Sequence, residues 1–397
     1  MSFSSRIDAD LASPSRELQA FRRLINPCTD AELENLARRS VAVTRRHFGK
    51  TMRLFAPLYL SNECVNSCAY CGFSRENAIL RVTLEIEQVA AEASHLAAQG
   101  FRNILLVAGE HPKFVSGDYL KLCLERLSPL IPGLALEVAP METEEYRPLA
   151  GAGSEGLVVY QETYDREVYR ELHTAGPKKD YDWRLDAPER AHAAGFRRLG
   201  VGVLFGLSDW RNEATALAAH LLHLGRVCWD SQITVSLPRL RPAAGGFQPR
   251  HSFDDRDLTQ LLCALRVTFP HIGIVLSTRE PAPLRDALAP LGVTMMSAGS
   301  HTEPGGYTGQ GSDRVKLTRN GRIVEQPEED PTTATGEGAT GQFSISDDRS
   351  PAEVAAMLVK SGLEPVWKDW DAAILGNVDA AAKTEKRAHD TPVPVAV

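Results

Sequence analysis

Eight short apolar runs recur between residues 54 and 300, and this repetition constrains the fold more than any other feature of the chain. The runs are rich in β-branched residues, and amphipathic stretches such as 84–101 and 186–196 lie between them. Continuous apolar strands that alternate with helices are typical of a parallel sheet covered by helices. Eight such units within about 250 residues predict a closed (β/α)8 barrel. The runs occupy residues 54–61, 103–110, 135–141, 156–163, 198–206, 232–240, 272–280 and 293–300.

An open, doubly wound α/β sheet is the alternative architecture. Nucleotide-binding sheets of that class usually carry a G-x-G-x-x-G turn that opens the first helix. No such turn follows the first apolar run, which weakens this alternative.

The barrel is one of four segments into which the chain divides. The stretches 17–25 and 31–48 have helical periodicity, and Thr29 or Asp30 is the expected N-cap of the second. The residues after the barrel are rich in Gly, Thr, Glu and Pro, which favours a mobile loop with a hairpin at Asn320-Gly321; a lid or docking segment is the alternative. We divide the chain into an N-terminal helical segment at 1–50, the barrel at 51–307, a polar insertion at 308–341 and a C-terminal segment with a short helix at 342–397.

Charge and hydropathy exclude several classes of protein. The 44 Lys and Arg against 51 Asp and Glu give a net charge of −7, which argues against binding to nucleic acid or to an anionic membrane. No apolar run reaches the ~20 residues of a membrane span, and residues 1–21 lack the apolar core of a signal peptide, so we expect a cytoplasmic protein. Seven cysteines, an odd number, argue against a disulfide scaffold and for metal or redox chemistry.

Three of the cysteines form a C-x3-C-x2-C cluster directly after the first predicted strand, at Cys64, Cys68 and Cys71. A structural zinc site usually needs a fourth Cys or His, and the candidates His111 and His173 have no paired spacing. A [4Fe–4S] cluster held by three cysteines keeps one iron free to bind a substrate or cofactor, whereas a ferredoxin fills all four positions. The motif therefore favours a catalytic cluster. A zinc-stabilised barrel and an electron-transfer barrel without radical chemistry are the alternatives.

This motif, with an aromatic residue before its third cysteine, resembles the hallmark of the radical S-adenosylmethionine (SAM) enzymes. Further blocks follow in the order of the predicted strands, from about residue 50 to 372, and resemble the 2-iminoacetate synthases, the tyrosine lyases of thiamine biosynthesis. The blocks are LYLSNECVNSCAYCGF, LLVAGEHPK, VVYQETY, GVGVLFGLSDW, SLPRLRP, LSTRE, MSAGSHTEPGGY and PVWKDWD.

The resemblance implies a radical SAM lyase that cleaves the Cα–Cβ bond of L-tyrosine to 2-iminoacetate (dehydroglycine) and p-cresol, after hydrogen abstraction from the amino group. Its implied cofactors are SAM and a [4Fe–4S] cluster ligated by Cys64, Cys68 and Cys71. Its implied partners are an external electron donor and a thiazole synthase. A lyase of another aromatic amino acid, such as tryptophan, is the alternative. The tyrosine-cleaving hydrogenase maturase carries a second cysteine cluster in a C-terminal extension, and no cysteine follows Cys263 here.

The resemblance also implies residues that bind SAM, at strand ends where barrel enzymes place their active sites. Tyr70 would pack beside the adenine. Gly109 and Glu110 would meet the methionyl ammonium, and a simple turn is their alternative role. Glu162 would bind the ribose hydroxyls. Arg184 would pair with the SAM carboxylate, with a surface cation as the alternative.

For the substrate, the resemblance implies a carboxylate clamp made from the last two strands. Arg279 follows the seventh run, and Ser297 and Ser300 end the eighth. The planar fork of an arginine can bind a carboxylate through two hydrogen bonds, to which a serine hydroxyl adds one. Residues 305–307, Gly-Gly-Tyr, either line the site or turn the chain.

Overall fold

The computed structural model describes residues 3–324 and 338–367. Eight parallel strands form a closed ring in which the last strand pairs with the first, so the predicted barrel is confirmed. Each strand overlaps one of the eight predicted apolar runs. In order around the ring they are β1 (Thr51–Ser61), β4 (Asn103–Ala108), β5 (Gly133–Glu137), β6 (Ser154–Val158), β8 (Arg198–Gly202), β9 (Gln232–Ser236), β10 (Gly273–Leu276) and β11 (Met295–Ser297).

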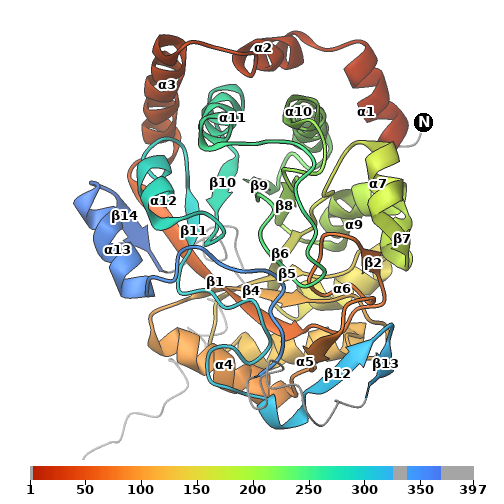
Figure 1. The fold of residues 1–397 in the computed structure, drawn as a ribbon. Helices are drawn as coiled ribbons and strands as arrows, with labels where there is room; N and C mark the ends of the chain where they lie inside the picture. Colours follow the sequence, from red (N-terminus) through yellow and green to blue (C-terminus); the bar gives the residue numbers. More distant parts are fainter. Residues whose placement is uncertain (1–2, 325–337, 368–397) are drawn as a thin grey trace, which may run out of the picture.

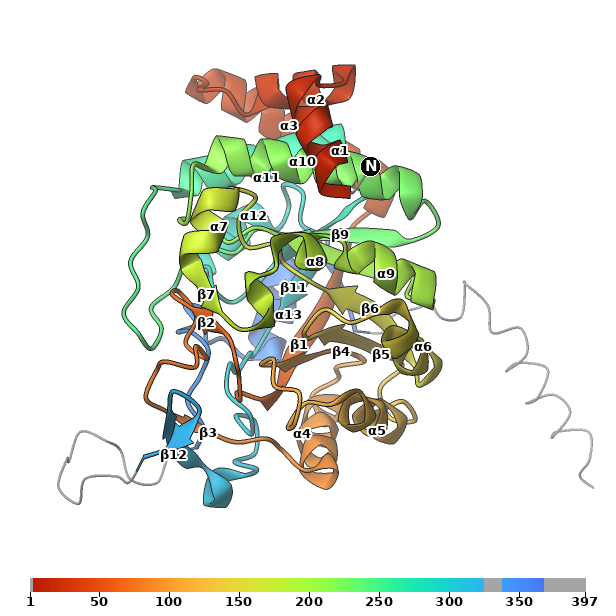
Figure 2. The ribbon, with the colours of Figure 1, turned by 90° about the vertical axis from the view of Figure 1, so that its right-hand side faces the viewer.

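Helices surround the barrel and cover the outer face of the strands (Figures 1 and 2). In α11, for example, Leu258, Leu261, Leu262 and Leu265 are all buried, at the i, i+3, i+4, i+7 spacing of one helix face. The helices between the strands are α4 (Ile86–Ala98), α5 (Gly117–Leu127), α6 (Thr143–Gly151), α7 (Arg166–Leu172), α8 (Tyr181–Leu185), α9 (Ala187–Ala194), α10 (Trp210–Val227), α11 (Asp255–Thr268) and α12 (Ala282–Leu288). No helix among the described residues is long and apolar enough to cross a membrane.

The side chains of β1 alternate between the hydrophobic core and a cavity inside the barrel. Met52, Leu54 and Leu58 are no more than 1% exposed and belong to the hydrophobic core. Alternate residues of a strand point to opposite faces. The intervening Phe55 and Tyr59 accordingly line a cavity inside the barrel. The strand pattern that builds the core therefore also delivers side chains to the interior.

Three N-terminal helices form an outer layer over α10 and α11 (Figure 1). The predicted N-cap Thr29 is found: its side chain accepts a hydrogen bond from the Glu32 amide, and the Glu32 side chain accepts one from the Thr29 amide. The helices are α1 (Phe3–Ala12), α2 (Arg16–Leu24) and α3 (Asp30–Phe48).

Segments after the barrel return to it at two places. The hairpin predicted at Asn320-Gly321 is confirmed, and its first strand pairs antiparallel with β3 near the cysteine loop. The final strand, β14, pairs parallel with the start of β1. Within the polar insertion, residues 325–337 lie outside the described residues, so its expected mobility stays a prediction there. The elements are β3 (Ile79–Arg81), β12 (Lys316–Arg319), β13 (Arg322–Ile323), α13 (Pro351–Lys360) and β14 (Glu364–Val366).

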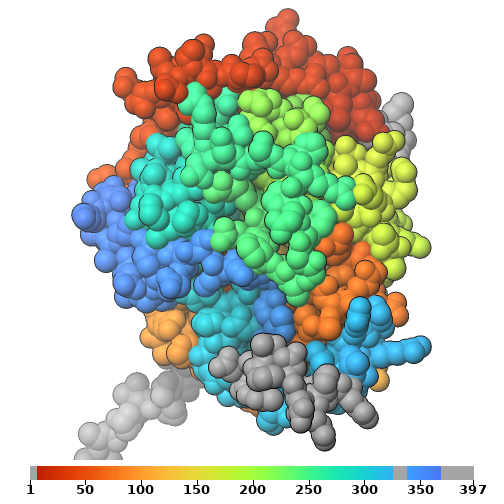
Figure 3. All heavy atoms as spheres, in the orientation of Figure 1, coloured from red at the N-terminus to blue at the C-terminus, as the bar shows by residue number. Residues whose placement is uncertain are grey.

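Two long segments of the chain meet over the mouth of the barrel, where the parallel strands end. The segment after β9 (green) and the segment that leads to α13 (blue) cover this face in Figure 3. They touch where the Ser344 amide donates to the Pro242 carbonyl at 2.8 Å. Because parallel strands all end at the same face, the loops that follow them gather beneath this cover.

Candidate active site

The three cysteines lie in the loop that follows β1, and all are free thiols. Cys68 lies in the short strand β2 (Ser67–Cys68), which pairs antiparallel with β7 (His173–Ala175). Burial, and after it the charge of Cys71, raises the pKa of the Cys64 thiol. Burial also raises the pKa of Cys68, an effect that the Lys178 ammonium opposes. These neighbouring thiols therefore need compensating positive charge to ionise.

Two cations next to the loop supply such charge. The buried Arg81 donates hydrogen bonds to the main-chain oxygens of Asn62, Phe73 and Ser74, all in the cysteine loop or next to it. The side chain of Lys178 is 13% exposed and its charge acts on Cys68 and Cys71. Thiolates bound to iron are favoured beside buried cations, so the residues present fit an iron–sulfur cluster.

The zinc alternative finds less support in this arrangement. Zinc needs ligands that converge on one ion. Within 3–324 and 338–367, no three His, Cys, Asp or Glu side chains are grouped so that they could hold a single metal ion. Three thiols spread along one loop suit a multi-iron cluster better, because each cysteine then binds a different iron.

Gly109 and Glu110, at the end of β4, hold the cysteine loop in place. A Cβ atom at Gly109 would lie 2.3 Å from the Glu63 carbonyl oxygen, so only glycine allows this approach. The Glu110 carbonyl accepts from the Val65 amide at 2.8 Å, and its carboxylate accepts from Asn66 Nδ2 at 2.7 Å. The structure thus places this pair against the cysteine loop, and contact with the methionyl ammonium stays a prediction.

Tyr70 is fixed through a histidine. Burial lowers the pKa of His173 to about 3, so its imidazole is neutral and has one donor and one acceptor nitrogen. Nδ1 lies 2.7 Å from the Tyr169 carbonyl and must donate. Nε2 therefore accepts from the Tyr70 hydroxyl at 2.8 Å. The ring of Tyr70 is thereby held beside the cysteines in one orientation.

Glu162 lies after β6 in the left-handed backbone region, at φ 72°. Burial opposes its ionisation, but Lys178 and then Arg184 lower its carboxyl pKa overall. Lys178 Nζ is 2.6 Å from Glu162 Oε1, and Arg184 Nη2 is 3.7 Å from it. Arg184 also donates from Nε to the Tyr160 carbonyl at 2.7 Å. The expected SAM-binding residues Glu162 and Arg184 thus form one charged group, with Lys178 as an additional member.

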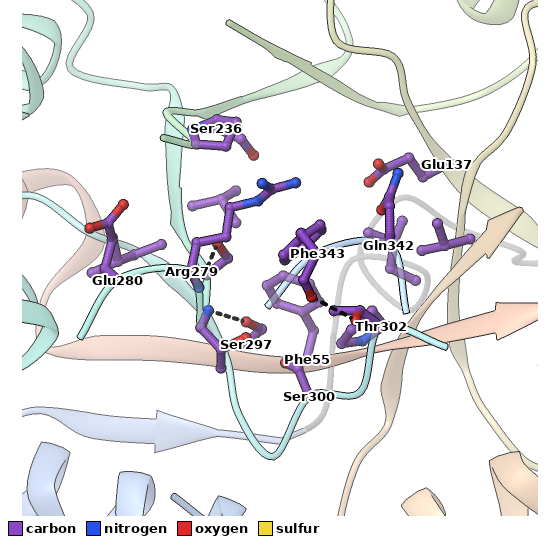
Figure 4. Close-up of a pocket in the computed structure, with 18 of the residues that line it drawn as sticks. Phe55, Glu137, Ser236, Arg279, Glu280, Ser297, Ser300, Thr302, Gln342 and Phe343 are labelled. Atoms are coloured by element: carbon purple, nitrogen blue, oxygen red, sulfur yellow. Dashed lines mark hydrogen bonds between the residues drawn. The ribbon is translucent and has the colours of Figure 1, made fainter. Parts of the chain in front are cut away.

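A first cavity, which we call the outer cavity, lies between this charged group and the cysteine loop. Tyr70, Glu162 and Lys178 line it, whereas Arg184 is not among its described lining residues. A second cavity, the barrel cavity, lies between the strands (Figure 4). Residues that line both cavities include Glu137, Tyr160, Arg279, Gln342 and Phe343. Because they share these walls, the two cavities are adjacent compartments of one site.

Arg279 lines both cavities at the end of β10. Its guanidinium carbon lies 3.4 Å from the centre of the Phe343 ring, and Nη1 is 3.5 Å from the Arg239 carbonyl. No carboxylate of the described residues forms an ion pair with it. A partly buried, unpaired guanidinium is suited to bind an anionic group of a ligand.

The two predicted serines differ in their contacts. Ser297 Oγ accepts from the Thr278 amide at 3.1 Å (Figure 4). The hydroxyl of Ser300, which is 4% exposed, has no hydrogen-bond partner among the described residues. Both residues line the barrel cavity. Ser300 is therefore the one whose hydroxyl is fully available to a ligand.

The glycines that follow β11 turn the chain and do not line either cavity. Gly305 has φ 76°, and a Cβ atom there would lie 1.9 Å from the Gln310 carbonyl oxygen. Tyr307 donates from its hydroxyl to the Pro57 carbonyl at 2.6 Å, and its amide donates to Glu92 at 3.0 Å. Of the two roles left open for residues 305–307, the structure shows the turn.

Sequence reasoning missed several residues of the site. Glu137 ends β5 as a lone acid in an apolar run, and its position at a strand end was a usable signal. Gln342 carries no such signal: its Nε2 lies 3.8 Å from Cys71 Sγ, and its Oε1 accepts from the Tyr59 hydroxyl at 2.8 Å. It comes from the segment beyond the polar insertion, and only the fold brings it here.

Comparisons with known proteins agree with this geometry. The family model of the radical SAM superfamily matches residues 58–219, and that of the Biotin and Thiamin Synthesis associated domain matches 236–364. The 2-iminoacetate synthase of Escherichia coli (strain K12) is 42% identical over 349 residues, which cover 88% of this chain and 86% of the relative. The enzyme of the same name from Salmonella typhimurium is 40% identical over the same shares.

A solved structure shares the fold over nearly the whole chain. The FeFe-hydrogenase maturase HydG from Carboxydothermus hydrogenoformans superposes with a TM-score of 0.78 and 34% sequence identity. The match covers 92% of this chain and 80% of that chain.

Proposed function

The chain belongs to the 2-iminoacetate synthase family of radical SAM enzymes, and from this membership we propose that it cleaves L-tyrosine at the Cα–Cβ bond to 2-iminoacetate and p-cresol. The observation that carries the proposal is the pair of adjacent cavities. One borders Cys71 and the SAM-binding candidates, and the other holds an unpaired arginine that suits an amino-acid carboxylate. A simple electron-transfer centre would need neither cavity.

Cys64, Cys68 and Cys71 would hold the [4Fe–4S] cluster, with SAM on its remaining iron. When bound, the two cofactors supply the 5′-deoxyadenosyl radical by which this superfamily abstracts hydrogen. Arg81 and Lys178 balance the negative charge of the thiolates. Gln342 lines both cavities, and its Nε2, 3.8 Å from Cys71 Sγ, is suited to donate a hydrogen bond to that sulfur.

We assign the outer cavity to SAM. The ionised Glu162 carboxylate is suited to accept hydrogen bonds from the ribose hydroxyls, and the immobilised ring of Tyr70 is suited to pack beside the adenine. Glu110 is suited to meet the methionyl ammonium while Gly109 keeps the cysteine loop close. Lys178 and then Arg184 lower the pKa of Glu162 and so keep it ionised, and direct pairing of Arg184 with the SAM carboxylate stays a prediction.

We assign the barrel cavity to tyrosine. Arg279 binds the carboxylate through its guanidinium fork, and the hydroxyls of Ser297 and Ser300 complete the clamp. Apolar side chains such as Phe55 and Leu105 line the same cavity and pack against the phenol ring. Enclosure by the strands and by the covering segments excludes water from the reacting groups.

The product and the electron each require a partner. An imine such as 2-iminoacetate hydrolyses readily in water, so we propose direct transfer to a thiazole synthase that builds the thiazole of thiamine. The match to the Biotin and Thiamin Synthesis associated domain supports this assignment. An external one-electron donor must reduce the cluster, because the chain holds no second cysteine group among its described residues.

Anaerobic turnover tests the proposed function. The protein is reconstituted with iron and sulfide, reduced, and incubated with SAM and either tyrosine or tryptophan. With tyrosine, but not with tryptophan, we expect 5′-deoxyadenosine together with p-cresol and glyoxylate. Glyoxylate is the hydrolysis product of the imine. A Cys68→Ala variant is the control and should make none of them. Deoxyadenosine only with tryptophan would contradict the substrate, and its absence with both would contradict the reaction class.

A further inference from the structure

Two opposite charges face each other across the barrel cavity. Glu137 ends β5, and Arg279 follows β10, the strand four places further around the eight-stranded ring. Strands four places apart lie on opposite sides of such a barrel. Figure 4 shows the Glu137 carboxylate and the Arg279 guanidinium on opposite sides of the cavity, both directed toward its interior. They are too far apart to form an ion pair with each other, which leaves room between them.

Neither charge is satisfied by the protein. Among the described residues, the Glu137 carboxylate has no hydrogen-bond or ion-pair partner, and the Arg279 guanidinium has no carboxylate partner. Both residues are partly buried. A charged group that is partly removed from water without a partner is costly, and a ligand that supplies the partner offsets this cost. A cation and an anion held apart across one cavity match the carboxylate and the ammonium of an α-amino acid.

The position of Glu137 also matters for the reaction. It lines the barrel cavity and the outer cavity, and the outer cavity also borders Tyr70, Cys71 and Glu162. A group bound to Glu137 therefore lies where the substrate compartment meets the proposed SAM compartment. The proposed reaction begins with hydrogen abstraction from the amino group, which has to occur at such a boundary.

We propose that Glu137 binds the α-ammonium group of tyrosine and takes one proton from it, so that the amine is neutral when hydrogen abstraction begins. The inference rests on the proposed function. In the transfer, one N–H bond of the ammonium breaks and an O–H bond forms on Glu137. The products are a neutral amine and a neutral carboxylic acid, so proton and charge balance within the pair.

The surroundings of Glu137 are consistent with a group that exchanges a proton near neutral pH. Burial and then the charge of Glu162 raise the pKa of Glu137 to about 7, while Arg279, Arg184 and Lys178 oppose the shift. The phenols of Tyr59 and Tyr160 also face it, and burial raises the pKa of both, so they stay neutral.

A binding cycle without turnover tests this role. The holoenzyme with SAM, left unreduced, is titrated with tyrosine and with 3-(4-hydroxyphenyl)propanoate, which lacks only the amino group. Wild type should prefer tyrosine, and Glu137→Gln should weaken tyrosine binding by about tenfold or more while the propanoate changes less than about threefold. An equal loss for both ligands, or no loss, would overturn the proposal.

Two further variants keep the cycle decisive. Ser236→Ala alters the same cavity through a residue that bonds Tyr160, and it should leave the preference for tyrosine unchanged. Glu137→Asp retains the charge and should keep most of the preference. If Glu137→Gln does not fold, Glu137→Ala takes its place in the cycle: loss of the preference with intact propanoate binding supports the proposal, and unchanged discrimination contradicts it. Iron content and SAM binding should equal those of wild type in each.

Turnover separates this inference from the proposed function. If wild type forms p-cresol and Glu137→Gln forms it with an unchanged kcat and pH profile, the Glu137 role is wrong and the function stands. If wild type forms no p-cresol, the function is wrong, and the binding cycle still decides whether Glu137 recognises an ammonium group.

Discussion

At the scale of the residue, Arg279 shows how shape as well as charge selects a ligand. Its guanidinium stacks on Phe343 at 3.4 Å and keeps its edge toward the cavity. A lysine would keep the charge but lose both the stacking and the two-pronged hydrogen bond to a carboxylate.

We therefore expect Arg279→Lys to raise the KM for tyrosine by about tenfold to a hundredfold, with iron content unchanged. Arg166→Lys is the matched control, because Arg166 also stacks on an aromatic ring, 4.0 Å from the centre of Tyr181. It does not line either cavity and should leave KM unchanged. Steady-state kinetics of p-cresol formation measure both variants, and an equal KM in Arg279→Lys would remove this residue from the clamp.

Glu137 also predicts how stability depends on pH. Its pKa rises from 4.5 to about 7 on folding, so the folded state holds the proton more tightly than the unfolded state. The stabilisation from the protonated form is present below about pH 4.5 and is lost as the pH rises through 7. Glu137→Gln does not ionise and so does not lose stability as the pH rises. We therefore expect its free energy of unfolding, relative to that of wild type, to be about 1–2 kcal/mol higher at pH 8 than at pH 5.

Thermal melts of the apoprotein at the two pH values measure this difference. Glu137→Asp, which still ionises, is the control and should keep a pH dependence of the wild-type sign. If the melting temperatures of Glu137→Gln and wild type differ by the same amount at pH 5 and pH 8, the carboxyl group does not titrate in this range.

At the scale of the element, the end of β4 and the loop after β1 are built as one unit. The close approach of Gly109 to Glu63 sets the height of the cysteine loop over the barrel. Hydrogen bonds from Val65 and Asn66 to Glu110 then fix its course. The glycine that follows the neighbouring strand β4 is thus needed for the cysteine loop to lie where it does.

Gly109→Ala should displace this loop, because a Cβ atom 2.3 Å from a carbonyl oxygen forces the backbone apart. We expect a lower iron content after reconstitution and a loss of about 1–3 kcal/mol in stability. Gly117→Ala is the control, since a Cβ atom at Gly117 would meet nothing within 4 Å. Iron analysis and thermal melts of both variants test the expectation, which fails if Gly109→Ala binds iron as wild type does.

At the scale of the whole molecule, a buried ion pair connects the C-terminal segment to the barrel. Asp347 and Arg285 have fully buried side chains and bond to each other, and Arg285 also donates to the Ser297 carbonyl. Arg349 pairs with Asp347 at 2.7 Å. This anchor lies a few residues after Gln342, so it holds the wall of the active site in place.

Removal of one partner leaves a buried charge without compensation. We expect Asp347→Ala to lower the free energy of unfolding by about 3–5 kcal/mol and to raise the KM for tyrosine, because the wall at Gln342 loosens. The adjacent Asp348 is exposed, and Asp348→Ala is the control that should change neither. Denaturant unfolding and steady-state kinetics of both variants measure these effects. Equal stability of the two variants would contradict the anchoring role of Asp347.

The sequence by itself determined the barrel, the cysteine cluster and the strand-end residues such as Arg279 and Glu162. Those signals are local: a strand's apolar run, a loop's spacing and a strand's last residues lie together in the chain, and parallel strands all deliver their ends to one face. Only the tertiary structure decided that Gln342 touches Cys71, that Lys178 pairs with Glu162, and that Glu137 faces Arg279. These contacts join segments far apart in sequence, and no local pattern encodes the closure of the ring that sets them opposite one another.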